Sequence, residues 1–189
     1  MRLSVAAVAV AAVLTIAVAG CTGGEPSSPA QSTSDFGLPA DASAAAAQAG
    51  LPMLGQEHLN VHYHAHLDVV VRGKAVTVPA FIGIDRAKSK IAPLHTHTPD
   101  GIVHIESATD VPFTLGQFFT EWGHPISATA IGSVKPASGE ELRVYRDGEL
   151  VTGDPAALKF EPHDEVFVWI GPASEKPTVP SSFDFANGL

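Results

Sequence analysis

The stretch that decides the fold is residues 62–71, which read HYHAHLDVVV. Successive side chains of a β-strand point to opposite faces of its sheet, so a strand here divides the stretch into two sets. One set is apolar: Tyr63, Ala65, Leu67, Val69 and Val71. The other set carries three imidazoles and a carboxylate: His62, His64, His66 and Asp68. We therefore predict a strand with one face in the core and the other face available for chemistry.

Turn residues after this stretch and near the end of the chain predict further strands. Arg72-Gly73-Lys74 is typical of a turn, with residues 75–84 as the returning strand of a hairpin. Asp147-Gly148 separates two strand-like segments and is a typical two-residue hairpin loop. Residues 166–170 read VFVWI and predict an apolar final strand. Most of the folded part is therefore expected to be β-structure.

One helix is predicted after Thr114, which forms the capping-box pattern with Gln117. Apolar side chains then recur at the spacing of a single helical face: Leu115, Phe118, Phe119 and Trp122. We expect this aromatic face to pack on the sheet, with Gly123 ending the helix. The predicted fold is a β-rich α+β domain, an antiparallel or mixed sheet with one packed helix. Its arrangement is either β-grasp-like or, as the alternative, a cupredoxin-like β-sandwich.

A second concentration of histidines comes in two short runs joined by a predicted hairpin. If Asp100-Gly101 is a two-residue loop, His97 faces His104, His95 faces Glu106, and all four side chains share one face. If a three-residue turn ends at the same glycine, His104 and Glu106 point away from the other two. Separation of polar from apolar side chains favours the first register, whereas turn chemistry favours the second. We expect the first register.

The two histidine-rich regions together supply seven candidate metal ligands: His62, His64, His66, His95, His97, His104 and Glu106. Imidazole is the commonest protein metal ligand, and side chains on neighbouring strands lie close enough to share an ion. Nitrogen ligands with one carboxylate suit zinc or copper(II), ahead of iron. A metal-free cluster that responds to pH is the alternative. The remaining histidines, His58, His124 and His163, are expected to have structural roles.

The first twenty residues predict an export signal, because Arg2 precedes an apolar run from Leu3 to Ala19. The end of this run, Val18-Ala19-Gly20-Cys21, resembles the lipobox of bacterial lipoproteins. That resemblance implies cleavage before Cys21, a diacylglycerol on its sulfur and attachment to the outer face of the cell membrane. An uncleaved membrane anchor is the alternative. The expected organisation is a signal peptide (1–20), a lipidated, flexible tether (21–57), a globular domain (58–173) and a C-terminal tail (174–189).

The composition excludes several classes of function. Asp and Glu outnumber Lys and Arg by 20 to 11, which gives a formal net charge of −9. The sequence has no basic cluster to neutralise phosphates, so nucleic acid is not an expected partner. Cys21 is the only cysteine, so its lipidation leaves no thiol for a zinc finger, an iron–sulfur cluster, blue copper or thiol catalysis.

The middle of the chain, residues 58–122, resembles exported domains of bacteria and archaea. The resemblance is carried by residues 64–67 (HAHL), 94–97 (LHTH), 101–106 (GIVHIE) and 115–119 (LGQFF). Because those domains have no established activity, it implies only that these segments belong together. The His-x-His spacing is also similar to that of cupins, carbonic anhydrases and Cu/Zn superoxide dismutases. The chain lacks the glutamate that a cupin needs near position 101, and it is short and without the partner motifs of the other two.

Three functions stay open at this point. The first is a membrane-tethered protein that binds zinc or copper(II) to buffer, scavenge or deliver the ion. The second is a small metalloenzyme, an oxidoreductase or hydrolase, with an open position on the metal and with Glu106 or Asp68 as base or orienting group. The third is a metal-free structural or partner-binding lipoprotein.

Overall fold

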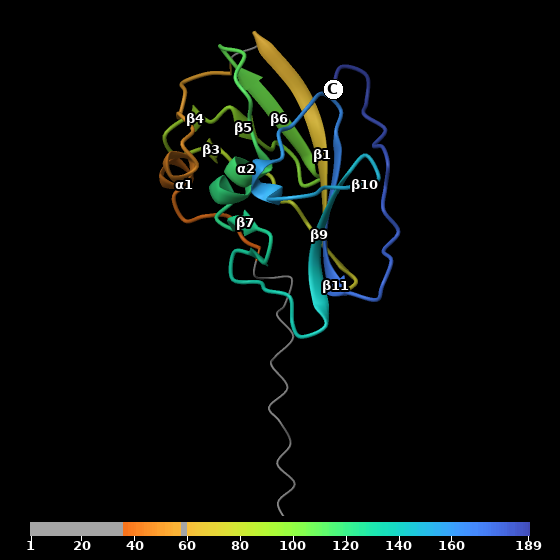
Figure 1. Cartoon of the computed structure of the whole chain (residues 1–189). Coiled ribbons are helices and arrows are strands. Elements are labelled where there is room, and N and C mark those ends of the chain that lie inside the picture. Colours follow the sequence, from red (N-terminus) through yellow and green to blue (C-terminus); the bar gives the residue numbers. More distant parts are fainter. Residues whose placement is uncertain (1–35, 58–59) are drawn as a thin grey trace, which may run out of the picture. The chain divides into compact units, whose positions relative to one another are not determined.

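The computed structural model describes residues 36–57 and 60–189. Its largest element is a seven-stranded mixed sheet, accompanied by two short α-helices (Figure 1). The fold is therefore β-rich α+β, as predicted. The expectations for the signal peptide, for Cys21 and for His58 concern residues outside the described ranges.

The helices and strands have the following bounds. The helices are α1 (Ala42–Gln48), α2 (Leu115–Glu121) and a 3-10 helix, η2 (Pro155–Ala157). The strands of the large sheet are β1 (Val61–Val71), β2 (Lys74–Val76), β5 (Leu94–His95), β6 (Ile102–Ser107), β9 (Glu140–Arg146), β10 (Glu149–Leu150) and β11 (Glu165–Pro172). Two small sheets pair β3 (Ile84–Asp85) with β4 (Lys90–Ile91), and β7 (Ile126–Ser127) with β8 (Ala130–Ile131).

Strand β1 lies in the middle of the large sheet, whose order is β10-β9-β11-β1-β6-β5. It pairs in parallel with β11 and antiparallel with β6 and β2, which makes the sheet mixed. The predicted hairpin at Asp147-Gly148 is confirmed, because Arg146 pairs with Glu149 and both loop residues have positive φ. Within the described residues no second large sheet faces this one, so the cupredoxin-like sandwich was the wrong alternative.

The alternation predicted for β1 separates two faces of the sheet. Ala65, Leu67 and Val69 are buried in the hydrophobic core that also contains the aromatic side chains of α2. We call this side the helix face, and the opposite side, which carries His62 and His64, the histidine face. In Figure 1 the helices lie to the left of β1 and the C-terminal tail lies to its right. The histidines therefore point away from the helices.

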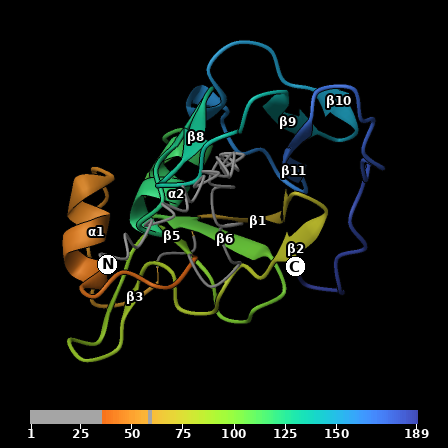
Figure 2. The same ribbon diagram turned by 90° about the horizontal axis from the view of Figure 1, so that it is seen from below.

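Helix α2 forms as predicted and supplies much of the core. The Thr114 hydroxyl oxygen accepts a hydrogen bond from the Gln117 backbone N–H, and the Gln117 side chain accepts one from the Thr114 backbone, which completes the capping box. Phe118, Phe119 and Trp122 are fully buried, and burial of each phenylalanine contributes about 1.5–3 kcal/mol. Helix α1 packs beside α2 (Figure 2). Neither these helices nor any other in the described part of the chain is long and apolar enough to cross a membrane.

The expectation of a flexible tether is wrong for residues 36–57, which pack against the core. Phe36, Ala46 and Leu51 are buried, and Leu54 forms an isolated β-bridge with Ile91. The expectation failed because the alanines of α1 carry little apolar surface each and give no clear hydrophobic face. Their small size instead allows α1 to lie close to α2.

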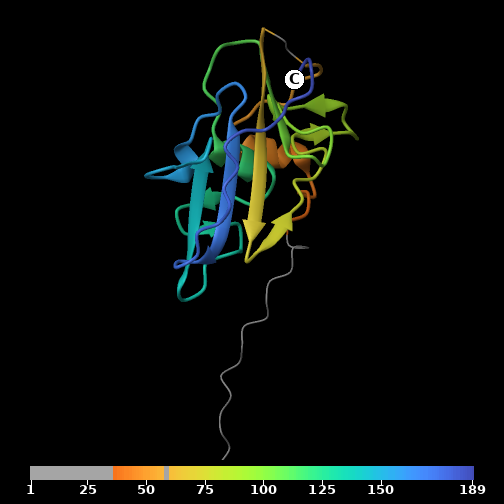
Figure 3. The same ribbon diagram turned by 90° about the vertical axis from the view of Figure 1, so that its right-hand side faces the viewer.

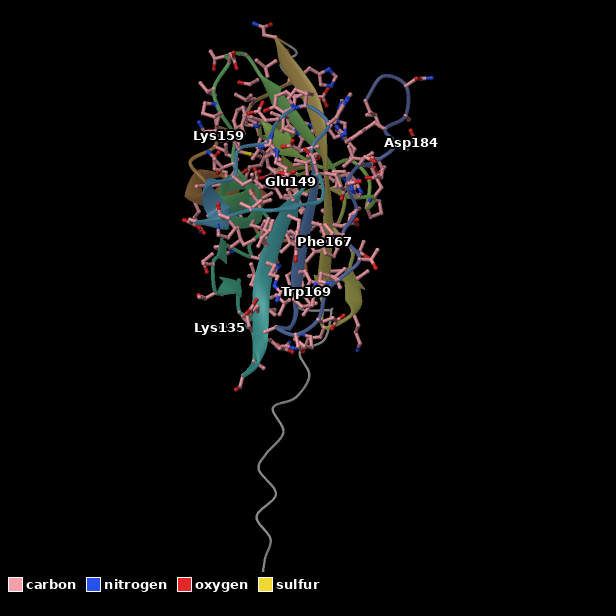
Figure 4. All side chains as sticks on the ribbon, turned by 45° about the vertical axis from the view of Figure 1, so that its right-hand side comes forward. Lys135, Glu149, Lys159, Phe167, Trp169 and Asp184 are labelled. Atoms are coloured by element: carbon pink, nitrogen blue, oxygen red, sulfur yellow. The ribbon has the colours of Figure 1, made fainter. Side chains whose placement is uncertain are left out.

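The C-terminal tail, residues 174–189, has no helix or strand and crosses the histidine face in front of β11 (Figure 3). On this face β11 presents Phe167 and Trp169, both buried, whose side chains are labelled in Figure 4. The Arg143 guanidinium lies over the Trp169 ring at 5.1 Å and donates hydrogen bonds to the carbonyls of Ala173 and Glu175. These contacts attach the start of the tail to the sheet.

Candidate metal centre

Three neighbouring strands and the segment that follows β5 bring five imidazoles and one carboxylate together on the histidine face. We call this group the histidine cluster, and its members are His62, His64, His95, His97, His104 and Glu106. Across the β1–β6 ladder, His62 pairs with Glu106 and His64 pairs with His104. Side chains paired across a ladder have Cβ atoms about 4.5–5.5 Å apart, so the pairing alone brings these groups into contact.

Both registers considered for the β5–β6 hairpin are wrong. His95 pairs with His104 and Leu94 pairs with Ile105, a slip of two residues from the expected register. The chain leaves β6 after His95 because Thr96 bonds elsewhere: its backbone N–H donates to the Ile82 carbonyl and its hydroxyl donates to the Pro79 carbonyl. Since side chains alternate with a period of two, an even slip keeps His95, His104 and Glu106 on the face predicted for them.

His104 lies at the centre of the cluster. Its ring centroid is 4.5 Å from that of His64, 4.6 Å from that of His97 and 5.2 Å from that of His95. The His64 Nε2 and His104 Nδ1 atoms are 3.0 Å apart, so one proton lies between these two nitrogens. Every other imidazole of the cluster except His62 therefore has a ring contact with His104.

The Glu106 carboxylate faces three of these imidazoles. Its Oε1 atom lies 3.5 Å from His62 Nε2, 3.6 Å from His104 Nδ1 and 3.8 Å from His95 Nε2. Two ligands on a tetrahedral zinc ion with bonds of 2.0–2.1 Å are about 3.3 Å apart, so these spacings are close to those of ligand atoms around one ion. The second oxygen of Glu106, Oε2, is buried without a hydrogen-bond partner.

A hydrogen bond to the backbone leaves one ring nitrogen of His95 free to bind an ion. Its Nδ1–H donates to the Ala92 carbonyl at 2.9 Å, which leaves the lone pair on Nε2. That Nε2 atom is fully buried, has no hydrogen-bond partner and faces Glu106. Metal-binding histidines have this arrangement, with one ring nitrogen held by the backbone and the other free to bind.

Burial disfavours the charged forms of four members of the cluster, His64, His95, His104 and Glu106. It lowers the pKa of His95 to about 3 and the pKa values of His64 and His104 to about 4, and neighbouring imidazoles add to each shift. Burial also raises the pKa of Glu106 to about 7. His64, His95 and His104 are thus neutral at physiological pH, which is the form that binds a metal.

Glu57 also reaches the cluster, although sequence analysis had placed it in the tether. Its Oε1 atom lies 3.6 Å from His97 Nε2, and its ligand atoms are close to those of His95 and Glu106. No spacing rule connects position 57 with the later strands, so only the fold brings it there. Glu57 and His97 are both partly exposed and form the open side of the cluster.

His66 lies on the same strand but outside the cluster. Its Nδ1 is 2.7 Å from Glu165 Oε2 and its Nε2 is 3.0 Å from the Asp100 carbonyl, so both nitrogens donate in the metal-free chain. With Asp68 and Glu165 it forms a separate group of mutually close ligand atoms. Burial acts to lower the pKa of His66, but Glu165 outweighs it through a hydrogen bond and its charge, and the pKa is raised. Phe183 stacks on the imidazole with ring centroids 3.8 Å apart. His66 is therefore an ion-pair partner, and Asp68 beside it also lies apart from the cluster.

His124 packs against Phe36 and Trp122, away from the cluster, whereas the His163 backbone N–H donates to the carbonyl of the cluster member His64 at 2.8 Å. His124 Nε2 bonds the Gly37 carbonyl, and His163 Nε2 bonds the Leu189 carbonyl. Both contacts tie chain segments together, and His124 serves as the control for the experiments below.

The described residues of the cluster could hold a metal ion, because they combine neutral imidazole nitrogens, a buried carboxylate and two buried polar atoms without partners. Their spacing identifies no particular metal. A scan against family models, a search of curated proteins and a search of solved structures gave no match to this chain.

Proposed function

We propose that this protein is an extracytoplasmic lipoprotein that binds a divalent transition metal, zinc or copper(II), and buffers, scavenges or delivers it. The observation that carries the proposal is that two members of the cluster each bury an unpartnered atom, His95 Nε2 and Glu106 Oε2. A buried polar atom without a partner costs about 1–3 kcal/mol. An ion bound by both side chains would give a partner to the His95 nitrogen and to the Glu106 carboxylate, whose Oε1 atom lies 3.8 Å from it.

The ligand types support the choice of metal. Imidazole nitrogens with carboxylate oxygens suit zinc and copper(II), whereas copper(I) prefers thiolate and thioether ligands. The chain has one cysteine, which the proposal assigns to the lipid, and two methionines. Delivery is supported by the open side of the cluster, because His97 and Glu57 are reachable from solvent.

The same open side favours a metalloenzyme as the second candidate. A catalytic metal needs a position for water or substrate, and the partly exposed His62 and His97 lie where such a molecule would enter. The two functions differ in one measurable property. A catalytic ion keeps an exchangeable water, while an ion held for storage has only protein ligands.

The lipid anchor is proposed from sequence alone, since Cys21 lies outside the described residues. Expression in a bacterial host with a clickable fatty acid should label the wild-type chain and leave Cys21→Ala unlabelled. Recovery of an unlabelled, soluble wild-type chain would remove the anchor from the proposal but would leave the metal site untouched.

Metal analysis of the reconstituted protein tests the metal site. The chain is stripped with a chelator, incubated with zinc or copper(II), desalted and measured by mass spectrometry of the elements. We expect at least one ion per wild-type chain and a lower metal content for His104→Gln, which lacks the imidazole at the centre of the cluster. His124→Gln should bind like the wild type. A wild-type chain that retains no transition metal would overturn the proposed function, and water exchange at the bound ion would favour the enzyme.

A further inference from the structure

We propose that the histidine cluster holds two metal ions, with the Glu106 carboxylate bridging them. This inference rests on the proposed function and adds the number of ions and the ligands of each. The cluster contains two groups of ligand atoms whose members all lie within 4.8 Å of one another, the first with His62 and His64 and the second with His95 and His97. His104 belongs to both groups.

The first group lies on the β1–β6 ladder. It consists of His62, His64 and His104, with the Glu106 Oε1 atom 3.5 Å from His62 Nε2 and 3.6 Å from His104 Nδ1. His64 Nε2 and His104 Nδ1 are 3.0 Å apart. These spacings lie on both sides of the ligand separation of about 3.3 Å around a tetrahedral ion. The first ion is thus expected at a site that paired strands hold nearly in place.

The second group lies on β5 and its neighbouring loops. His95 Nε2 is 3.8 Å from Glu106 Oε1, and His97 Nε2 is 3.6 Å from Glu57 Oε1. Glu57, His95 and Glu106 also form a group of mutually close ligand atoms. The second ion is therefore expected between β5 and the segment that precedes β1.

One ion leaves too many ligands unused. A tetrahedral ion takes four ligands, while the cluster with Glu57 offers five imidazoles and two carboxylates. The two most exposed imidazoles, His62 and His97, belong to different groups. Glu106 is near both groups and has a second, unpartnered oxygen, so its carboxylate can bind one ion with each oxygen and reduce the repulsion between them.

The two ions should differ in how tightly they are held. The ligands of the first come from two strands joined by backbone hydrogen bonds, so little ordering is needed when the ion binds. In the second group His97 and Glu57 lie outside strands and are partly exposed. We expect the second ion to bind more weakly and to exchange faster, as an ion for delivery would.

Titration of the full, metal-free chain with zinc, followed by calorimetry, tests this inference. The wild type should bind two ions in two steps of different affinity. His62→Gln should weaken the tighter step, and His97→Gln and Glu57→Gln the weaker step, each by roughly tenfold or more, since even an outer partner of a ligand is worth 10–100-fold. These three side chains are partly exposed, so their replacement leaves the core intact. His124→Gln is the matched control.

Copper(II) gives an independent measurement of the bridge. Two copper(II) ions held about 3.5–4 Å apart, as in two-metal sites, couple magnetically and give a half-field signal in electron paramagnetic resonance. The signal should be present in the loaded wild type and absent from Glu106→Gln and His97→Gln. One zinc ion per wild-type chain, or loss of the same ion in His62→Gln and His97→Gln, would overturn the two-ion inference and leave the proposed function standing. No bound zinc or copper would overturn both.

Discussion

His64 and His66 stand two residues apart on β1 and point to the same face, yet their surroundings are opposite. His64 lies among other imidazoles, and burial lowers its pKa to about 4. His66 lies between the buried Glu165 carboxylate and the Asp100 carbonyl, and its pKa is raised. The partner of an imidazole, and not its place in a histidine run, decides whether it is a free base or a cation.

Loss of His66 should have the largest effect on stability. His66→Gln leaves Glu165 buried without its cation, and removing one partner of a buried ion pair costs about 3–5 kcal/mol. Urea unfolding of the metal-free chain measures the loss. Zinc binding of this variant should stay at the wild-type level, and a large fall in zinc affinity would mean that His66 belongs to the metal site after all.

Metal should stabilise the chain through the cluster alone. At a free zinc concentration one hundred times its dissociation constant, each ion adds about 2.7 kcal/mol to the free energy of unfolding. Thermal unfolding with and without zinc should show this gain in the wild type and in His124→Gln. His104→Gln removes an imidazole that belongs to both groups, so its melting temperature should rise less with zinc than that of the wild type. A full response of His104→Gln would contradict the ligand assignment.

The contributions of the histidine cluster and of His66 to the free energy of unfolding should change with pH in opposite directions. His64, His95 and His104 have lowered pKa values in the folded state, so their contribution is present above the unfolded value of about 6.5 and is lost as the pH falls toward 4. The pKa of His66 is raised, so its contribution is present below about 6.5 and is lost as the pH rises through the folded value.

Urea unfolding of the metal-free chain between pH 4 and pH 9 separates these contributions. His64→Gln should flatten the fall in stability on the acid side, and His66→Gln should flatten the fall on the alkaline side. Glu106 has the opposite effect on stability at acid pH. Its pKa is raised to about 7 in the folded state, so it stabilises the fold most below its unfolded value of about 4.3. The same profile in both histidine variants would contradict the contrast between the two regions.

The sequence predicts much of the fold because its strongest patterns are local. The alternation of residues 62–71, the capping box at Thr114 and the loop at Asp147-Gly148 each depend on neighbouring residues, and each is observed. The β5–β6 register could not be predicted, since Thr96 is held by hydrogen bonds to residues 79–82 that no local pattern reveals. The sheet face on which each ligand lies could still be predicted, because a register shift of two residues leaves every side chain on the same face.

The candidate site, like the fold, could be predicted only where neighbouring residues determine it. Alternation along the strands placed the cluster's strand residues on one face. It could not separate His66 from the cluster, because its partner Glu165 is distant in sequence. Glu57 was missed for the converse reason, as its approach to His97 depends on the packing of residues 36–57. Partners distant in sequence therefore decided both corrections.

The smallest expected effect concerns the aromatic cover on His66. Phe183 stacks on this imidazole at 3.8 Å, whereas the rings of the cluster contact mainly one another. A stacked aromatic pair contributes about 0.5–1.5 kcal/mol beyond its buried area, so Phe183→Leu should lower the free energy of unfolding by about 1 kcal/mol. The loss should be largest at pH 6, where His66 is charged and an aromatic face attracts it most. Phe185→Leu, which removes the tail's other ring from His163, is the matched control. Equal losses in the two variants at pH 6 and pH 9 would mean that Phe183 only covers apolar surface and does not stabilise the cation beneath it.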